Sequence, residues 1–532
     1  MGQQHIPFYK TGYFSPLICN YLDEKTELKT FYNRFPKFEN FKAQIEEKQH
    51  SEHTTKTHKK VLVKVLKNQY QNIDTSYLTE ENIDLLENSN TFTITTGHQL
   101  NLFTGPLYFL YKIVSAINLS NQLKKEYPNY NFVPVYWMAT EDHDFEEINY
   151  FNFKGKKIQW NRESSGAVGD LSTKGLKEVF TVFSNQLGTG ENAEFLKRLF
   201  EKAYLEHSNL ADATRYLANA LFKDYGLVII DANDADLKRQ FIPFIEDELL
   251  NQTSYKAVSN TNEKLVKSYN IQVTPREINL FYLTQNLRER IVFQNEKYKV
   301  LNTDISWTKS EIQEMLLKHP ERFSPNVIMR PLYQEVILPN LCYIGGGGEL
   351  AYWFQLKQLF NEVNVPFPIL LLRNSVLIQT ESQAKKLKNL NITAEETFLK
   401  RDALINKKVR EISNINIDFS EQKKHLKQQF EDLYNLAEQT DKSFVGAVKA
   451  QEVKQIKGLE NLENRLLKAQ KRALSDQASR MTDIQNVLFP NQSLQERNAN
   501  FSEFYLEYGE TLIPKLIENL QPLNGTFLIL NM

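Results

Sequence analysis

The sequence FTITTGHQLNLFTGPLYFLYKIVSAINLSNQLKKEYPNYNFVPVYWMATEDHD, residues 92–144, decides the fold. It begins with a short β-branched run that ends at Gly97, which is typical of a buried strand. Pro106 then stands where the first turn of a helix tolerates a residue without an N–H group, and apolar residues mark one helix face as far as Leu123. A second apolar run, residues 132–139, follows. Strand, helix and strand at this spacing predict a βαβ unit with a parallel sheet.

The rest of the chain predicts further strands of the same sheet and two insertions. Residues 211–231 form another helix-and-strand step, and residues 369–372 are a last buried strand. Short alternating runs between residues 278 and 301 are separated by polar turns and favour a partly antiparallel accessory unit. We therefore expect an α/β chain with core segments 1–150, 211–254 and 326–375, a small insertion 151–210, an accessory insertion 255–325, a helical arm 376–489, and a C-terminal segment 490–532 that returns to the core.

The segment 376–489 has the composition of a helical arm. It contains no proline, its only glycines are Gly446 and Gly458, and Lys, Glu, Gln and Leu dominate. Apolar residues such as Leu426, Phe430 and Leu433 recur at helical spacing with charged residues between them. An antiparallel helical pair or a coiled coil is therefore expected. The stripe can pack within the chain or against a partner, and the pattern does not decide between these.

Composition excludes several classes of protein. The 64 basic and 65 acidic residues of this 532-residue chain give a net charge of −1, so there is no electrostatic case for binding nucleic acid or an anionic membrane. Cys19 and Cys342 are the only cysteines, which excludes a disulfide framework and fits a reducing compartment, most simply the cytoplasm. No apolar run approaches the roughly 18 residues of a membrane span. We expect neither nucleic acid nor membrane as a partner.

Polar residues follow the first strand at the place where a ligand would bind. In open α/β sheets, ligands bind beyond the carboxyl ends of the strands. Gly97, His98, Gln99, Asn101 and Gly105 lead from that strand into a helix whose free N–H groups and dipole suit phosphate. His98 can donate a hydrogen bond to phosphate oxygens as charge develops. The alternative is that the Gly-His pair only shapes a turn.

A cluster of ionisable residues follows the second strand. Glu141, Asp142, His143 and Asp144 place carboxylates and an imidazole beside an apolar stretch. Such a set can hold Mg²⁺, for which Asp142 and Asp144 are the candidate ligands, or it can orient a substrate amine and act as a general base. The alternative is a helix N-cap with solvated acids.

A third cluster lies between Arg330 and Ser375. Gly345, Gly346, Gly347 and Gly348 stand between an apolar strand and a helix, which suggests close approach of a ligand to the backbone. They match neither the Walker motif nor the dinucleotide fingerprint. Glu349 can cap the helix or bind an amine, and Arg373, Asn374 and Ser375 can contact an anion or simply start a helix.

These motifs, in this order, closely resemble the family of bacillithiol biosynthesis cysteine-adding enzymes. The resemblance is carried by Thr96 to Tyr108 with Tyr111-Lys112, Pro134-Val-Tyr-Trp137, Glu141 to Ile148, Arg330-Pro331, Gly345 to Glu349, Ala351-Tyr-Trp353 and Leu494-Gln-Glu-Arg497. It implies a Rossmann-like core with connecting-peptide insertions, related to class I aminoacyl-tRNA synthetases, and a coiled-coil arm that supports a homodimer. Thr95 stands where the synthetase pattern His-x-Gly-His has its first histidine.

The resemblance also implies a reaction, the joining of L-cysteine to glucosaminyl-malate through an amide to complete bacillithiol. Because a free carboxylate must be activated, we expect ATP as co-substrate, with the catalytic residues among His98, Asp142, His143 and Asp144. The remaining candidates for substrate or nucleotide binding are Gly97, Gln99, Asn101, Gly105, Trp137, Glu141, Arg330, Gly345 to Gly348, Glu349, Tyr352, Arg373, Asn374 and Ser375. Two other functions stay open, a dimeric scaffold without catalysis and a nucleotidyltransferase with another acceptor.

Overall fold

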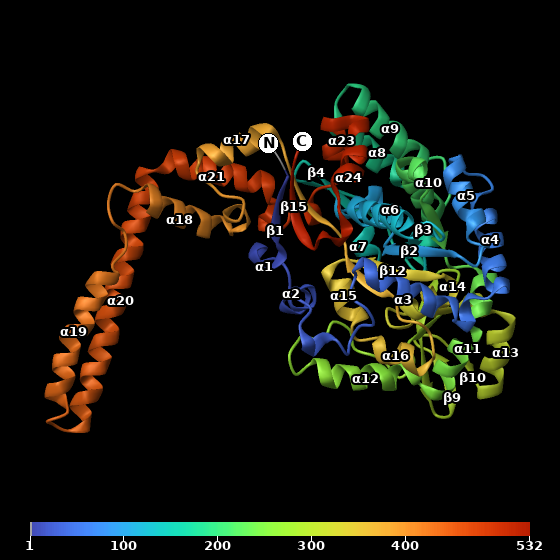
Figure 1. Cartoon of the computed structure of the whole chain (residues 1–532), viewed down its shortest axis with the longest axis horizontal. Coiled ribbons are helices and arrows are strands. Elements are labelled where there is room, and N and C mark those ends of the chain that lie inside the picture. Colours follow the sequence, from blue (N-terminus) through green and yellow to red (C-terminus); the bar gives the residue numbers. More distant parts are fainter. Residues whose placement is uncertain (1–2) are drawn as a thin grey trace.

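The core of the computed structural model, which describes residues 3–532, is a five-stranded parallel sheet (Figure 1). Its strands lie in the order β13, β12, β2, β3 and β6. Their bounds are β2 Thr91–His98, β3 Asn131–Met138, β6 Val228–Asp231, β12 Asn340–Gly345 and β13 Ile369–Leu372. The strand order places β2 at the centre, and all four pairings are parallel. This confirms the expected α/β fold.

Helices cover both faces of the sheet because successive strand residues point to opposite sides. Helix α6, Tyr108–Glu126, packs on one face, where Phe109 meets the ring of Tyr136. Helix α14, Met329–Ile337, lies on the other face, where Tyr333 meets Trp137. Further helices around the sheet are α3 Phe38–Gln49, α4 Lys56–Tyr70, α10 Leu210–Phe222, α11 Ala235–Asn251, α15 Gly347–Trp353 and α16 Lys357–Glu362.

The accessory insertion is a five-stranded sheet in which every pairing is antiparallel. Its order is β10, β9, β8, β7 and β11. The elements are α12 Thr253–Leu265, β7 Leu280–Thr284, β8 Leu287–Gln294, β9 Lys297–Val300, β10 Ser306–Trp307, α13 Lys309–Lys318 and β11 Phe323–Pro325. The small insertion holds the hairpin β4 Tyr150–Phe153 and β5 Lys156–Gln159 with α8 Leu176–Leu187 and α9 Glu191–Tyr204.

The two ends of the chain meet in a separate three-stranded sheet. Strand β15, Thr526–Asn531, pairs antiparallel with β1, Gln4–Pro7, and parallel with β14, Ser375–Gln379. The helical composition of the segment from residue 376 onward was a wrong guide for residues 376–379, which are strand. Val376, Leu377 and Ile378 are buried in this sheet, and tertiary pairing decides their conformation.

The arm projects away from the body (Figure 1). It contains α17 Glu381–Asn389, α18 Arg401–Ile412, α19 Ser420–Ala437, α20 Lys442–Ala473 and α21 Ser475–Leu488. Helices α19 and α20 run antiparallel, since Tyr434 bonds Glu452 near the tip and Lys423 bonds Glu463 further back. Phe430 is buried between them, whereas Leu433 is exposed. In the described residues, no helix is long and apolar enough to cross a membrane.

Candidate functional site

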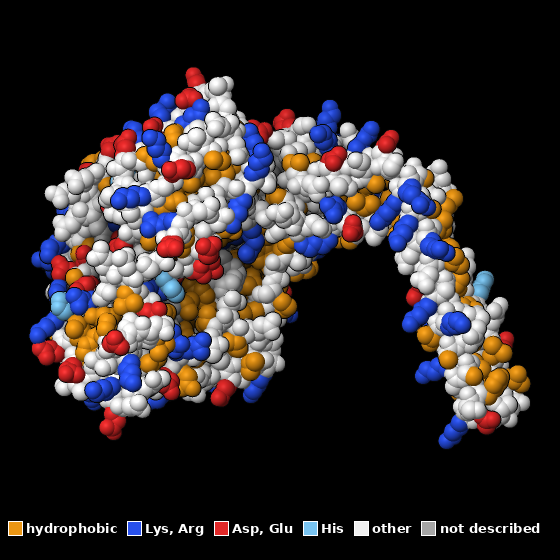
Figure 2. Space-filling model, turned by 180° about the vertical axis from the view of Figure 1, so that it is seen from behind, with side chains coloured by type: hydrophobic (Ala, Val, Ile, Leu, Met, Phe, Trp, Pro, Cys, Tyr) orange, Lys and Arg blue, Asp and Glu red, His pale blue; other side chains and the backbone are white. Residues whose placement is uncertain are grey.

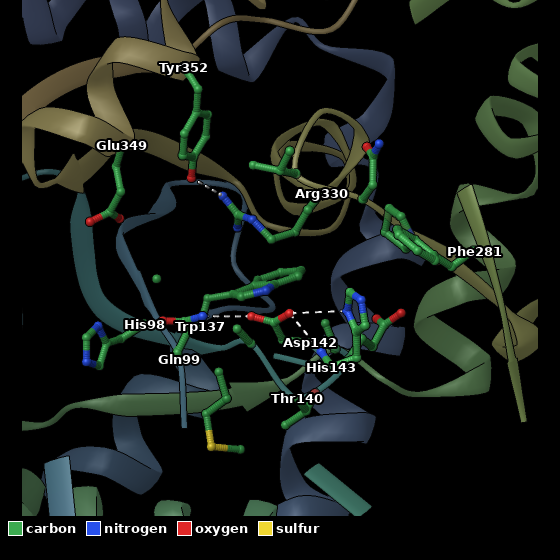
Figure 3. A pocket seen from close by; sticks show the side chains of 18 of the residues that line it. His98, Gln99, Trp137, Thr140, Asp142, His143, Phe281, Arg330, Glu349 and Tyr352 are labelled. Carbon is green, nitrogen blue, oxygen red and sulfur yellow. Dashed lines mark hydrogen bonds and ion pairs between the residues drawn. The ribbon is translucent and has the colours of Figure 1, made fainter. Parts of the chain in front are cut away.

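A cavity of about 690 Å³ lies at the carboxyl ends of the central strands, within the usual size of ligand sites (Figure 3). The floor comes from the ends of β2 and β3, one wall from α14 and α15, and the opposite wall from the accessory sheet. Predicted site residues that line it are Gly97, His98, Gln99, Trp137, Glu141, Asp142, His143, Arg330, Glu349 and Tyr352. The structure thus brings together residues far apart in the sequence.

Other predicted site residues do not line this cavity. They are Asn101, Gly105, Asp144, Gly345, Gly346, Gly347, Gly348, Arg373, Asn374 and Ser375. Asn500 donates hydrogen bonds to the carbonyls of Phe103 and Gly105, and the N–H of Leu107 bonds the carbonyl of Ala499. The start of α6, which we expected to bind phosphate, is therefore covered by the C-terminal segment.

His98 is a buried histidine with one free nitrogen. Its ring lies against Tyr108 and Phe109, and Nε2 has no hydrogen-bond partner. The other ring nitrogen bonds the carbonyl of Thr104, so it carries the proton when the ring is neutral. Burial, with Lys112 and Arg373 nearby, lowers the pKa of His98 well below its usual value. A neutral ring with this bonding offers Nε2 as an acceptor, which favours a ligand N–H or O–H over the phosphate contact we expected.

The lowered pKa of His98 predicts a pH-dependent stability. Below about pH 6.5 the unfolded chain takes up a proton that the folded chain resists, so stability is lost as the pH falls through that value. We expect His98→Asn to remove the part of this stability loss that comes from His98. The melting temperature of the wild type should therefore drop more than that of the variant between pH 7.5 and 5.5. Equal drops would contradict the burial of a neutral His98, and His425→Asn, at an exposed histidine, is the control.

Glu349 is held by a lysine and a tyrosine at the same end of the cavity. Lys112 Nζ lies 2.6 Å from Glu349 Oε1, and Tyr343 Oη donates to Oε2 at 2.7 Å. Lys112 also donates to the carbonyl of Gly97 at 2.6 Å, which fixes the end of β2. Burial opposes charge on Glu349, but the bonds from Lys112 and Tyr343 lower its pKa below the usual value. The group is therefore an ionised carboxylate, already paired.

The four consecutive glycines make room for protein side chains. A Cβ on Gly345 would meet Glu349 and Tyr343, one on Gly346 would meet Glu349, and one on Gly347 would meet Ile18. A Cβ on Gly348 would meet nothing within 4 Å. The run therefore serves the close approach of Glu349 and the packing of α15 in this structure, in place of the ligand approach that the sequence suggested.

Gly97 and Gly348 offer a matched pair of substitutions. In Gly97→Ala the new Cβ would lie 3.2 Å from Tyr343 Oη and 3.8 Å from Arg330 Nη1. We expect stability to fall by about 1 kcal/mol and ligand affinity to fall with it, because both side chains face the cavity. Gly348→Ala should stabilise the helix by about 0.5–1 kcal/mol and leave activity unchanged. Thermal melts and activity assays test this, and a loss of activity in Gly348→Ala would restore the ligand role of the glycine run.

The acidic cluster divides between the cavity and the surface. Asp142 accepts hydrogen bonds from Gln99 Nε2 at 2.9 Å and from the N–H of His143 at 2.8 Å. Burial would raise the pKa of Asp142, but bonds from His143 and Gln99 outweigh it and hold the pKa well below normal. Asp144 accepts from the N–H of Glu147 and caps the short helix α7, Phe145–Ile148. The N-cap alternative therefore describes Asp144, whereas Asp142 faces the ligand space.

His143 and Glu141 join the core to neighbouring elements. Arg288 Nη1, from β8, lies 2.7 Å from His143 Nδ1, so this nitrogen accepts and the neutral ring carries its proton on Nε2. Glu141 pairs at 2.7 Å with Lys238 of α11, whose side chain is fully buried. The first contact fixes the accessory wall against the strand ends, and the second ties α11 to the end of β3.

Arg330 is the cationic group best placed for a ligand anion. Its Nη1 donates to Gln334 Oε1 at 3.1 Å and its Nη2 to Tyr352 Oη at 3.4 Å. Within residues 3–532 it forms no ion pair with a carboxylate. Figure 3 shows the guanidinium above Trp137, pointing into the cavity. The side chain is half-buried, and although burial lowers the pKa of Arg330, the nearby Tyr352, Tyr343 and Glu349 outweigh it and raise the pKa. Because none of them forms an ion pair with the guanidinium, an anionic ligand can still be its partner.

Arg373 lies just behind the cavity and is already paired. Its Nη2 bonds Glu496 at 2.7 Å, and its side chain lies over the ring of Tyr108. Asn374 bonds Ser115, and Ser375 lies within reach of both Arg373 and Glu496. These residues hold the C-terminal segment on the core. The sequence suggested that these residues either contact a ligand anion or start a helix. The observed contacts agree with neither.

Several lining residues escaped the sequence analysis. The largest group comes from the accessory unit and its flanks, namely Arg276, Phe281, Arg288, Arg290 and Asn326. Their segments carry no motif, because what brings them to the cavity is the packing of an insertion over the strand ends. Tyr343 was also missed, while Tyr108 and Lys112 appeared only as members of the motif that carries the family resemblance and were given no role of their own. A lysine on the apolar face of a predicted helix was a signal that could have found Lys112.

Comparison with known proteins explains this architecture. Residues 1–374 match the family model described as "Bacillithiol biosynthesis BshC, N-terminal Rossmann-like domain", and residues 376–532 match "Bacillithiol biosynthesis BshC, C-terminal coiled-coil domain". The chain belongs to the BshC family. The expected Rossmann-like core with a coiled-coil arm is thereby confirmed.

Relatives in the BshC family are similar over nearly the whole chain. One from Flavobacterium johnsoniae is 63% identical and covers 99% of both chains. One from Cytophaga hutchinsonii is 37% identical over 96% of this chain and 95% of the relative, and one from Bacillus cytotoxicus is 28% identical over 84% and 86%. Each bears the name "Putative cysteine ligase BshC". These names agree with the ligase class expected from the sequence.

Proposed function

We propose that the chain joins L-cysteine to the amine of glucosaminyl-malate through an amide bond, completing bacillithiol in the cytoplasm. Membership of the BshC family and the ligase names of its relatives support this reaction. The observation that carries the proposal is a single cavity with an unpaired guanidinium, Arg330, and an ionised carboxylate, Asp142. Such a site complements a substrate that bears both carboxylates and an amine.

Glucosaminyl-malate fits the end of the cavity between Asp142 and the accessory wall. Its glucosamine amine, when protonated, complements Asp142, and its malate carboxylates complement Arg288, Arg290 and Arg330. Cysteine and the nucleotide then occupy the end lined by His98 and Glu349. The two ends meet over Trp137, where a carboxyl group and an amine can approach each other.

The reaction requires an activated carboxyl group and a deprotonated amine. ATP converts the cysteine carboxylate to an adenylate or an acyl phosphate. The ammonium group of the substrate first loses one proton to water; the neutral amine nitrogen then attacks the carbonyl carbon, a second proton leaves the nitrogen for water, and the phosphate-containing group departs. Asp142 is a weak base because its pKa is low, so it orients the amine while that group is cationic. His98 Nε2 is a buried acceptor without a partner, and because the pKa of His98 is also low, we assign it a hydrogen bond to the cysteine or the nucleotide and not the role of base.

Magnesium, if it accompanies the nucleotide, would draw most of its ligands from phosphate and water. Among residues 3–532 there is no group of three or more His, Cys, Asp or Glu side chains arranged to hold a metal ion. Asp144 caps α7 and does not line the cavity, whereas Asp142 does, so the pair does not fit a shared ion. Of these two carboxylates, Asp142 is the one that would contact the magnesium ion. Divalent cations supply charge neutralisation of the transferred phosphate.

Incubation of the purified protein with ATP, cysteine and glucosaminyl-malate tests the proposal. We expect a thiol product with the mass of the amide and with consumption of ATP, and we expect none when cysteine is omitted. The nucleotidyltransferase alternative predicts pyrophosphate release without cysteine. The scaffold alternative predicts no product in vitro and unchanged cellular thiol levels in the His143→Ala/Asp144→Ala double variant.

We further propose a homodimer formed through the arm. The helices α19 and α20 expose several large apolar side chains, and Figure 2 shows such side chains gathered near the tip of the arm. They are Leu433 and Leu436 on α19 and Phe444, Val453 and Leu462 on α20. Exposed apolar side chains that gather on a surface are typical of one that another chain covers.

Changing two of these residues should separate the dimer. Leu436 and Leu462 are 54% and 52% exposed, so Leu436→Glu/Leu462→Glu should fold normally but place charges in the contact. We expect the mass from light scattering to fall from that of two chains to that of one. Lys427→Glu, exposed on the same arm, should leave it unchanged. A wild type that is already monomeric at micromolar concentration would contradict the proposal.

A further inference from the structure

A chain of buried polar side chains runs from helix α3 to the cavity. Lys48 of α3 lies 3.2 Å from Glu335 of α14, and neither side chain has any exposed surface. Glu335 Oε1 accepts from Gln334 Nε2 at 3.0 Å. Gln334 Oε1 in turn accepts from Arg330 Nη1 at 3.1 Å. The mechanism described above does not use Lys48, Gln334 or Glu335.

Stability alone does not account for this ion pair. Desolvating two charges can cost more than their attraction returns, and apolar side chains of similar volume are often as stable in such places. Neither Lys48 nor Glu335 touches the cavity. The pair therefore calls for another role.

The contacts of Gln334 supply that role. An amide group presents a carbonyl oxygen on one side and an NH₂ group on the other, and its neighbours decide which way it faces. A carboxylate accepts hydrogen bonds only, so Glu335 binds the NH₂ side of Gln334 and turns the carbonyl toward Arg330. With the amide reversed, NH₂ would face the guanidinium, and neither group could accept a hydrogen bond.

Glu335 itself is fixed to the central strand. Asn340 Nδ2 donates to Glu335 Oε1 at 2.7 Å, while Asn340 Oδ1 accepts from Thr95 Oγ1 at 2.8 Å. Thr95 stands in β2, whose end carries Gly97 and His98. The carboxylate thus links the position of Arg330 to the strand that forms the cavity floor.

We infer that Glu335 is a positioning residue for Arg330 and acts through the amide of Gln334. Glu335 thereby sets the orientation of the guanidinium, and only the effect of that orientation on substrate binding rests on the proposed function. Lys48 neutralises the buried carboxylate and holds its second oxygen.

Two double variants, which differ from each other only at residue 335, separate an effect on the position of Arg330 from an effect on folding. Lys48→Met/Glu335→Gln removes both charges but keeps Oε1 as acceptor for Gln334 and Asn340. Lys48→Met/Glu335→Met has a similar side-chain volume but no acceptor. Crystal structures should show Arg330 unmoved in the first variant and displaced, with its bond to Gln334 lost, in the second. Gln334→Met, which leaves the ion pair intact, should displace Arg330 in the same way and replaces the second variant if that one does not fold.

Kinetics then tests the consequence. We expect Lys48→Met/Glu335→Met to raise the KM for glucosaminyl-malate about tenfold, and Lys48→Met/Glu335→Gln to leave it within about twofold. In an Arg330→Met background the two double variants should have equal KM values, because the residue through which Glu335 acts is gone. If the guanidinium stays in place in both Lys48→Met/Glu335→Met and Gln334→Met, the inference is wrong. A displaced guanidinium with unchanged KM supports it and contradicts the substrate role given to Arg330.

Discussion

Arg330→Met is expected to raise the KM for glucosaminyl-malate about 100-fold, the largest effect on substrate binding that we foresee for a single residue. Its guanidinium has no carboxylate partner in residues 3–532 and points into the cavity, so a substrate carboxylate is its counter-charge. Removing one partner of a desolvated charge pair costs about 2–5 kcal/mol, and a change of about 100-fold in KM lies within that range. Steady-state kinetics with varied glucosaminyl-malate measures the change, and calorimetry with L-malate measures it without turnover.

Two variants control for the charge and for the fold. Arg330→Lys keeps the charge but loses the planar fork, so we expect an intermediate KM. Arg239→Met removes an arginine outside the cavity, where the ion pair with Asp236 is half exposed, and should behave as wild type. If Arg330→Met binds both substrate and malate as tightly as wild type, the carboxylate site lies elsewhere.

Asp142→Asn is expected to lower kcat/KM about 100-fold. The substitution keeps the shape of the side chain and removes the negative charge that faces the substrate amine. Gln99 Nε2 would then meet an amide whose orientation is no longer fixed, so the position of the side chain also suffers. Rates at several pH values separate the two effects, because loss of ammonium binding matters only where the amine is protonated.

Asp144→Asn is the matched control, two residues away. Asp144 is exposed, caps α7 and does not line the cavity. Asparagine is as good an N-cap as aspartate, so stability and activity should both stay close to wild type. A larger loss of activity in Asp144→Asn than in Asp142→Asn would reverse the roles that we give to the two carboxylates.

The local pattern of the sequence was sufficient for the centre of the fold. The run from Phe92 to Asp144 predicted β2, α6 and β3, and it placed Gly97, His98 and Asp142 at one edge of the sheet. These features depend on periodicity of 2.0 and 3.6 residues and on where strands end, which a single segment encodes.

Other features depend on contacts between distant segments and could not be predicted in this way. Arg288 lies in an alternating strand with nothing to distinguish it from a surface residue, and it reaches His143 only because the accessory sheet packs over the strand ends. The covering of the α6 start by Ala499 and Asn500 likewise depends on residues about four hundred positions away. Asp142 and Asp144 have the same side chain, and only the turn between strand and helix separates their roles.

The three-stranded sheet that joins the chain ends sets an order for synthesis and folding. Strand β1 is synthesised about 520 residues before its partner β15, and β14 also pairs with β15. At about 5–20 residues per second, β1 waits roughly half a minute to two minutes for that partner. The root of the arm therefore cannot close on the body until β15 has left the ribosome, and a nascent chain stalled before residue 526 carries two unpaired strand edges.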